Sequence, residues 1–277
     1  HASTNSTYTG GTTVNGGTLK AGSSSQPFGT GAVVEINTGE VVIDLNGKTI
    51  SNALTLYSYS APTVYALTSS ATGGVQQTGA VTLGSNVVLG LGTAGNTMAI
   101  NGAITDTTGY SLTINQNSDA GTVIFGSTSN AYTGNTTIAS GTLRLGNDNV
   151  IPDGAGKGNL TVNGTLDLYG HAETINGLSG SGTIDNTSTA SNATLTVGAN
   201  NQTSTFSGVL QNSNANSKTL ALVKTGTGTL TLSGASTYSG GTSINGGVLQ
   251  LNTGTLCGTS SGAACSGSGQ SLYSSAV

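Results

Sequence analysis

The sequence predicts an all-β fold, a right-handed parallel β-helix (β-solenoid) of roughly a dozen turns. Three observations support this prediction: a glycine-rich composition, short segments that alternate between polar and apolar residues, and an internal repeat. Glycine occurs 45 times in 277 residues, and tryptophan does not occur. Because glycine costs about 1 kcal/mol in a helix relative to alanine, this composition disfavours helices throughout the chain.

The short alternating segments predict the strands. Examples are Thr-Leu-Arg-Leu at 142–145 and Thr-Leu-Thr-Leu at 229–232, and residues 165–168 and 194–197 follow the same pattern. A period of two places one face of a strand against a core and the other toward solvent. The Asn-Gly, Gly-Gly and Ser-Gly pairs between these segments suit the positive φ angles of tight turns. The chain is therefore expected to consist of short strands joined by turns.

One segment occurs three times, at residues 8–19, 132–143 and 238–249. In each copy a tyrosine precedes the first aliphatic residue by six positions and the second by eleven. Such self-similarity favours a solenoid over a closed barrel. We expect the aliphatic residues to point into the core, and the tyrosines to cap a corner or stack on the outside rather than bind a ligand. The expected core residues are Val14, Leu19, Ile138, Leu143, Ile244 and Leu249, and the repeat tyrosines are Tyr8, Tyr132 and Tyr238.

A shorter segment occurs twice, as Asp-Leu-Asn-Gly-Lys at 44–48 and as Asp-Leu-Tyr-Gly-His at 167–171. An Asn-Gly pair suits a tight turn, and the match between the segments predicts a turn in both. This correspondence places His171 in a turn at the surface, in the position that Lys48 occupies in the first segment.

The repeats divide the chain into three parts. Residues 1–22 hold a partial N-terminal repeat that is available as a docking segment. Residues 23–251 form the β-helix body, in which a long unit is duplicated at about 23–145 and 146–251. Residues 252–277 form a tail rich in glycine and serine, which contains the two cysteines, Cys257 and Cys265. In an exported chain these cysteines are expected to form an intrachain disulfide, with intermolecular pairing or free thiols as alternatives.

Charge excludes several functions. Charged residues make up 6% of the chain, the net charge is −4 and the pI is about 4.8, whereas nucleic-acid binding requires a basic face. No run of 18 apolar residues predicts a membrane-spanning helix. The acidic residues are scattered singly, Arg144 is the one arginine, and His1 and His171 lie too far apart to predict a metal site. We therefore expect no enzyme activity, no cofactor and no metal.

Residues 224–251 closely resemble the autotransporter-associated β-strand repeat of bacterial secreted and surface proteins, and residues 164–168 and 175–184 resemble the sequence between such repeats. The resemblance implies a passenger-type β-helix that is secreted, extracellular or held at the bacterial cell surface. It implies little about activity, because members of the family serve as adhesins, enzyme carriers and matrix proteins. The chain opens at His1 without a signal peptide, which indicates a processed chain, a fragment or another export route.

Two functions are compatible with these observations. The first is a non-enzymatic structural or adhesive protein, a rigid β-helical surface stalk or passenger whose partner is a host or matrix ligand. The alternative is a subunit of an extracellular filament in which the chain binds itself, head to tail, through its terminal turns. Open strand edges at an incomplete first repeat favour the alternative. Ice binding is disfavoured, because the Thr-x-Thr pairs do not recur at one constant spacing.

Overall fold

The computed structural model describes residues 6–23, 25–35, 40–57, 65–91, 94–116, 118–213 and 217–252, and the backbone of 271–273. Within these ranges every regular element is a β-strand, and the strands stack as a parallel β-solenoid of about ten turns. The predicted fold is therefore confirmed, with slightly fewer turns than the dozen expected. The chain separates into two compact units, unit 1 (1–135 and 139–143) and unit 2 (136–138 and 144–277).

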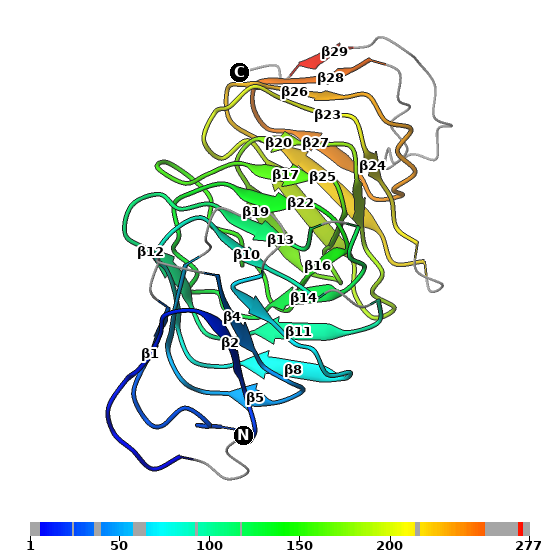
Figure 1. Ribbon diagram of the computed structural model, residues 1–277. Helices are drawn as coiled ribbons and strands as arrows, with labels where there is room; N and C mark the ends of the chain where they lie inside the picture. The colour runs from blue at the N-terminus through cyan, green and yellow to red at the C-terminus, as the bar shows by residue number, and fades with distance from the viewer. Residues whose placement is uncertain are drawn as a thin grey trace. The chain divides into compact units, whose positions relative to one another are not determined.

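Three columns of parallel strands build unit 1, and Figure 1 shows one of them, β5, β8, β11 and β14. The first column is β1 (Thr12–Val14), β3 (Val33–Glu35), β6 (Leu54–Leu56), β9 (Val81–Leu83) and β12 (Ile104–Asp106). The second is β2 (Gly17–Lys20), β4 (Val41–Asp44), β7 (Leu67–Thr68), β10 (Val87–Leu89) and β13 (Leu112–Ile114). The third is β5 (Thr49–Ile50), β8 (Gly74–Gln77), β11 (Thr97–Ile100) and β14 (Thr122–Phe125).

The register of the first column explains why threonine and small aliphatic residues alternate in the sequence. The inward residues at the start of β3, β6, β9 and β12 are aliphatic and pair with one another, and the outward residues that follow them pair with a threonine or valine, so apolar and polar positions form separate ladders. The buried ladder is Val33, Leu54, Val81 and Ile104, and the outward ladder is Thr13, Val34, Thr55, Thr82 and Thr105. Parallel stacking at about 4.8 Å thus builds the core from one aliphatic residue per turn.

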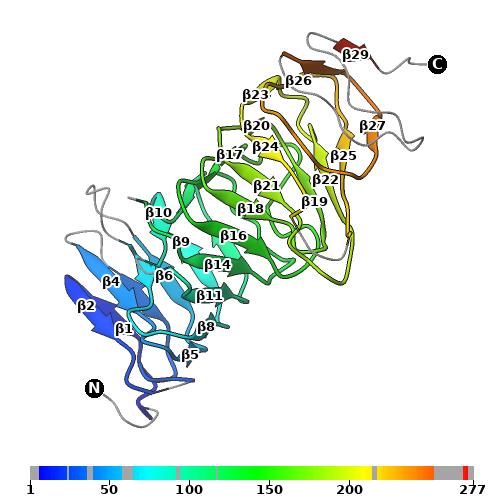
Figure 2. The same ribbon diagram turned by 90° about the vertical axis from the view of Figure 1, so that its right-hand side faces the viewer.

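Unit 2 contains four columns, and Figure 2 shows β18, β21 and β24 following one another in one of them. Two columns are β15 (Thr136–Ile138), β17 (Leu160–Val162) and β20 (Leu178–Ser179), and β16 (Thr142–Leu145), β18 (Thr165–Asp167), β21 (Thr183–Asp185) and β24 (Val209–Leu210). The third is β19 (Ala172–Ile175), β22 (Ala193–Val197), β25 (Leu220–Lys224) and β27 (Thr242–Ile244). The fourth is β23 (Ser204–Phe206), β26 (Thr229–Leu232), β28 (Val248–Leu251) and β29 (Ser271–Tyr273).

The last of these strands, β29, falls within the predicted Gly/Ser-rich tail and pairs with β28 in antiparallel orientation. Every other strand pair whose register is described is parallel. Cys257 and Cys265, the predicted disulfide pair, lie outside the described residues.

One corner of unit 2 consists of glycines stacked on glycines. A Cβ atom on Gly182 would lie 2.1 Å from the carbonyl oxygen of Gly164, and one on Gly208 would lie 2.0 Å from that of Gly182. Gly234 approaches Gly208 in the same way, at 1.9 Å. Because no larger residue fits where the backbones of successive turns touch, this column accounts for part of the high glycine content.

Candidate functional site

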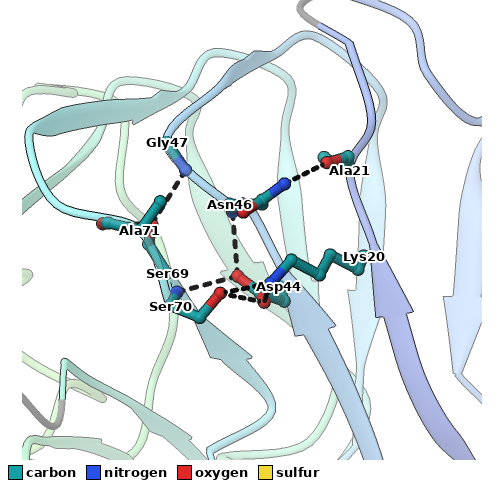
Figure 3. A network of polar contacts seen from close by, with 8 residues as sticks. All are labelled: Lys20, Ala21, Asp44, Asn46, Gly47, Ser69, Ser70 and Ala71. Carbon is teal, nitrogen blue, oxygen red and sulfur yellow. Dashed lines mark hydrogen bonds and ion pairs between the residues drawn. The ribbon is translucent and has the colours of Figure 1, made fainter. Parts of the chain in front are cut away.

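The most organised polar group in unit 1 surrounds Asp44, at the end of β4 (Figure 3). Its Oδ1 accepts hydrogen bonds from the backbone N–H of Asn46 at 2.8 Å and of Ser70 at 2.9 Å. Its Oδ2 accepts from the Ser70 hydroxyl at 2.6 Å and lies 3.4 Å from the Lys20 ammonium. The carboxylate therefore joins the preceding turn, its own turn and the following turn. We call this arrangement the Asp44 corner.

The electrostatics of the Asp44 corner favour the ionised acid. Burial by itself raises the pKa of Asp44, but the hydrogen bonds from Ser70 and Asn46 and the charge of Lys20 outweigh it, and the net pKa lies below its ordinary value. Lys20 also donates to the Ser70 hydroxyl at 2.8 Å. The ionised carboxylate thus acts as a hydrogen-bond acceptor between turns.

Unit 2 repeats this arrangement around Asp167, at the end of β18. Its Oδ1 accepts from the backbone N–H of Tyr169 at 3.1 Å and of Thr187 at 3.2 Å. Its Oδ2 accepts hydrogen bonds from the Thr187 hydroxyl at 2.7 Å and from Arg144 Nε at 2.8 Å. We call this the Asp167 corner. It has the same architecture as the Asp44 corner, with arginine in place of lysine and tyrosine in place of asparagine.

The turns behind the two corners confirm the correspondence predicted between residues 44–48 and 167–171. Lys48 N–H bonds the Leu45 carbonyl and His171 N–H bonds the Leu168 carbonyl, both at 2.9 Å. Asn46 and Tyr169 both have φ near +48°, and a glycine with positive φ follows each of them. His171 lies in this turn as predicted, with Nδ1 3.0 Å from Asp148 Oδ1.

A third aspartate, Asp185, is in register with Asp167 one turn further along. Its Oδ1 accepts a hydrogen bond from the backbone N–H of Ser213 at 2.9 Å. Its Oδ2 accepts hydrogen bonds from the Ser213 hydroxyl at 2.7 Å and from Gln211 Nε2 at 2.8 Å. An amide therefore replaces the cation in this corner. The three aspartates share a structural role, which is to bond the backbone and a hydroxyl group of the next turn.

Two glutamates are buried without a cation. Glu35 Oε2 accepts from Tyr57 N–H at 2.5 Å, and the Glu173 oxygens accept from the N–H groups of Val150 and Ile151 at 3.0 and 2.9 Å. Burial raises the pKa of each to about 8 despite these bonds. For Glu173 the charges of Asp153 and Asp148 add to the effect of burial. Both glutamates thus bond backbone N–H groups of a neighbouring turn.

Lys224 is buried at the end of β25. Its Nζ donates to the carbonyl oxygens of Thr225, Gly226 and Gly246 at 2.5, 3.1 and 3.3 Å. Burial lowers the pKa of Lys224. The lysine thus bonds two successive turns of unit 2 through their carbonyl groups.

Within the described ranges, no three His, Cys, Asp or Glu side chains lie close enough to hold a metal ion. In the same part of the chain, no helical segment has the length and hydrophobicity of a membrane span.

The structure places the repeat residues as follows. Ile138, Leu143 and Leu249 are buried, whereas Val14, Leu19 and Ile244 are half-buried. These three lie on β1, β2 and β27, each of which stands at one end of its column, so that no further described strand stacks on them. Among the tyrosines, Tyr132 and Tyr238 are buried rather than stacked on the outside, and Tyr8 is 46% exposed. Tyr8 and Tyr238 each bond the hydroxyl of the threonine four residues later.

Sequence reasoning missed the two ion pairs, Lys20–Asp44 and Arg144–Asp167. The signal was present, because Lys20 and Arg144 each directly follow the last aliphatic residue of a repeat copy. Each also precedes its aspartate by one turn of the solenoid, 24 and 23 residues respectively (44 − 20 and 167 − 144). The third copy has Gln250 at this position and forms no such pair.

Comparison with known families identifies the repeat. The model of the passenger-associated-transport-repeat matches residues 3–21, 118–145 and 222–251, and these segments contain the three copies found in the sequence. The chain is also 36% identical over 124 residues to the adhesin BmaC autotransporter of Brucella suis biovar 1 (strain 1330). That match covers 44% of this chain and 4% of the length of the relative. No solved structure matches the chain. The three matched segments show that the chain carries the repeat that is associated with autotransporter passengers.

Proposed function

We propose that the chain is a non-enzymatic adhesive segment of a bacterial surface protein, a β-helical stalk or passenger held outside the cell. The observation that carries the proposal is the set of three passenger repeats within a parallel solenoid. The matched relative is named an adhesin, and this chain spans only about 4% of its length, so the proposal concerns the segment and its surface.

The arrangement of ionisable groups supports a role without catalysis. Asp44, Asp167 and Asp185 bond the neighbouring turns, and Glu35 and Glu173 are buried against backbone N–H groups. Catalysis by a paired acid and base requires the two groups to face a common substrate. These five acids instead bond neighbouring turns of the solenoid. The outward threonine ladder of the first column supplies a surface for contact with a ligand.

The proposal is tested by asking whether display of the chain makes a non-adherent bacterium adhesive. Bacteria that display the chain are incubated with epithelial cells and with deposited extracellular matrix, and the attached bacteria are counted. The matched control displays the Gly182→Asp variant, whose side chain cannot fit against Gly164. Greater attachment by the wild-type chain is expected, and equal attachment by wild type, variant and empty host on every surface would contradict the proposal.

The alternative function is a subunit of a head-to-tail filament. Among the described strands, β1 and β2 each pair with a strand on one side only, so their other edges are open to pairing, whereas Ser25 bridges the other edge of β5. In the fourth column of unit 2, β28 already pairs with β29, which another chain would have to displace in order to pair with β28. Electron microscopy of the purified chain separates the two functions, because filaments with a regular axial repeat are expected only for the alternative.

A further inference from the structure

Arg144 and Tyr169 form an exposed cationic and aromatic pair in the Asp167 corner. The guanidinium carbon lies 4.3 Å from the centre of the Tyr169 ring. The Arg144 side chain is 32% exposed and Tyr169 is 45% exposed. A guanidinium stacked on an aromatic ring in this way is held by cation–π attraction and has its orientation fixed.

The tyrosine is not explained by the turn in which it lies. Tyr169 has φ +48°, a left-handed conformation that asparagine tolerates much better than an aromatic residue. The equivalent residue of the Asp44 corner is Asn46, with the same φ. Because nearly half of the Tyr169 surface remains exposed, burial of the ring does not offset this cost. A strained and exposed aromatic residue is a feature that selection for the fold alone does not favour.

In the Asp167 corner the carboxylate acceptors are engaged within the protein, whereas part of the guanidinium donors is not. Both Asp167 oxygens are occupied, each accepting two hydrogen bonds. Both Asp185 oxygens, one turn away, are occupied as well. Within the part of the chain that the structure describes, the only hydrogen bond of the Arg144 side chain comes from Nε. The corner therefore presents guanidinium Nη donors and an aromatic ring, whereas its carboxylate oxygens are already engaged within the protein.

We propose that Arg144 and Tyr169 bind the carboxylate of an acidic sugar, a uronic or sialic acid residue. The two Nη groups match the two oxygens of a carboxylate, and Asp167 accepts its hydrogen bond from Nε rather than from these groups. The exposed part of the Tyr169 ring packs against the sugar ring. This inference rests on the proposed adhesive function for its biological setting, and it names the chemistry that one surface site recognises.

The single arginine of the chain provides the assay. In ¹H–¹⁵N spectra of the intact chain, the Arg144 Nε–Hε group gives one side-chain signal, which is followed during titration with trigalacturonate and with 3′-sialyllactose. Methyl-esterified trigalacturonate and lactose are the matched neutral controls. A saturable shift is expected with at least one acidic sugar and not with its neutral control. Comparison of the two acidic sugars separates a matrix uronate from a host sialic acid.

Variants separate this site from general charge attraction. Tyr169→Asn introduces the residue that the Asp44 corner uses, so the fold is preserved, and it is expected to weaken binding about three- to tenfold. Arg144→Gln is expected to weaken it at least tenfold. Lys20→Gln, in the Asp44 corner, is expected to have no effect. For the variants, binding is followed through the saturation-transfer signal of the sugar.

Two results would overturn the inference: no shift with either acidic sugar, or equal loss of binding in Lys20→Gln and Tyr169→Asn. Adhesion of the displayed chain that persists in Tyr169→Asn and Arg144→Gln would overturn the site while leaving the proposed function in place. Absence of adhesion by the wild-type chain, together with a saturable Arg144 shift, would contradict the proposed adhesive function while leaving the sugar-binding site in place.

Discussion

Replacing Asp167 with asparagine tests whether the aspartate corners stabilise the solenoid. Asparagine has nearly the same shape and keeps one carbonyl oxygen for the N–H groups of Tyr169 and Thr187. Its amide group then lies where Oδ2 accepted from Arg144 and from the Thr187 hydroxyl. The hydroxyl can rotate and accept instead, but the arginine loses its partner.

The expected loss of stability follows from these contacts. A hydrogen bond to a charged group contributes about 1.5–3 kcal/mol. Arg144 is about one-third exposed, so water replaces part of what it loses, and the Thr187 bond is largely recovered. We expect Asp167→Asn to lower the free energy of unfolding by about 2 kcal/mol, which corresponds to a fall in Tm of about 4–8 °C for a chain of this size.

A graded series provides the controls. In the Asp44 corner the cation lies further away, at 3.4 Å, and the Lys20 side chain is 40% exposed, so Asp44→Asn should cost about 1 kcal/mol. Asp148 is mostly exposed, and Asp148→Asn should cost less than about 0.5 kcal/mol. Urea unfolding followed by circular dichroism measures all three variants, and hydrogen exchange at the Thr187 amide locates the effect. Equal stability of the Asp167 and Asp148 variants would refute the reasoning.

Two further predictions concern buried groups. Burial raises the pKa of Glu35 and Glu173 to about 8. Between about pH 5 and 8 the folded chain therefore binds protons that the unfolded chain has released. The free energy of unfolding should fall as pH rises through this window, by at most about 1.4 kcal/mol per pH unit for each glutamate. Urea midpoints at pH 5, 6.5 and 8 measure this, and a midpoint that rises with pH would contradict it. Gly182→Ala places a Cβ 2.1 Å from the Gly164 oxygen and should cost more than about 2 kcal/mol, whereas Gly241→Ala meets no atom within 4 Å and should change stability by less than about 1 kcal/mol. Thermal unfolding compares the two variants, and equal Tm values would show that the glycine column is not tightly packed.

The sequence was sufficient to predict what depends on local patterns. Alternation of threonine with aliphatic residues predicted strands such as 142–145 and 229–232, and both are strands in the structure. The match between 44–48 and 167–171 predicted a shared turn, because the positive φ of its third residue and the following glycine are local requirements. The repeat predicted parallel stacking, because equivalent residues recur in successive copies.

Contacts between turns could not be predicted in the same way, because the turns differ in length. Leu160 pairs with Leu178, 18 residues later, whereas Leu54 pairs with Val81, 27 residues later. With such variation, spacing alone does not indicate which cation reaches which aspartate, and the shared position of Lys20 and Arg144 in the repeat was the signal that remained. The burial of Lys224 against three carbonyl groups was also hidden, because a lysine at the end of an alternating strand ordinarily remains at the surface.

The most direct test of the central claim is saturable binding of the purified, labelled chain to intact epithelial cells and to extracellular matrix. The adhesive function predicts a binding curve that reaches a plateau, is competed by unlabelled chain and is absent for Gly182→Asp. Binding that remains linear with concentration, or that is the same for the wild-type chain and this variant, would contradict it.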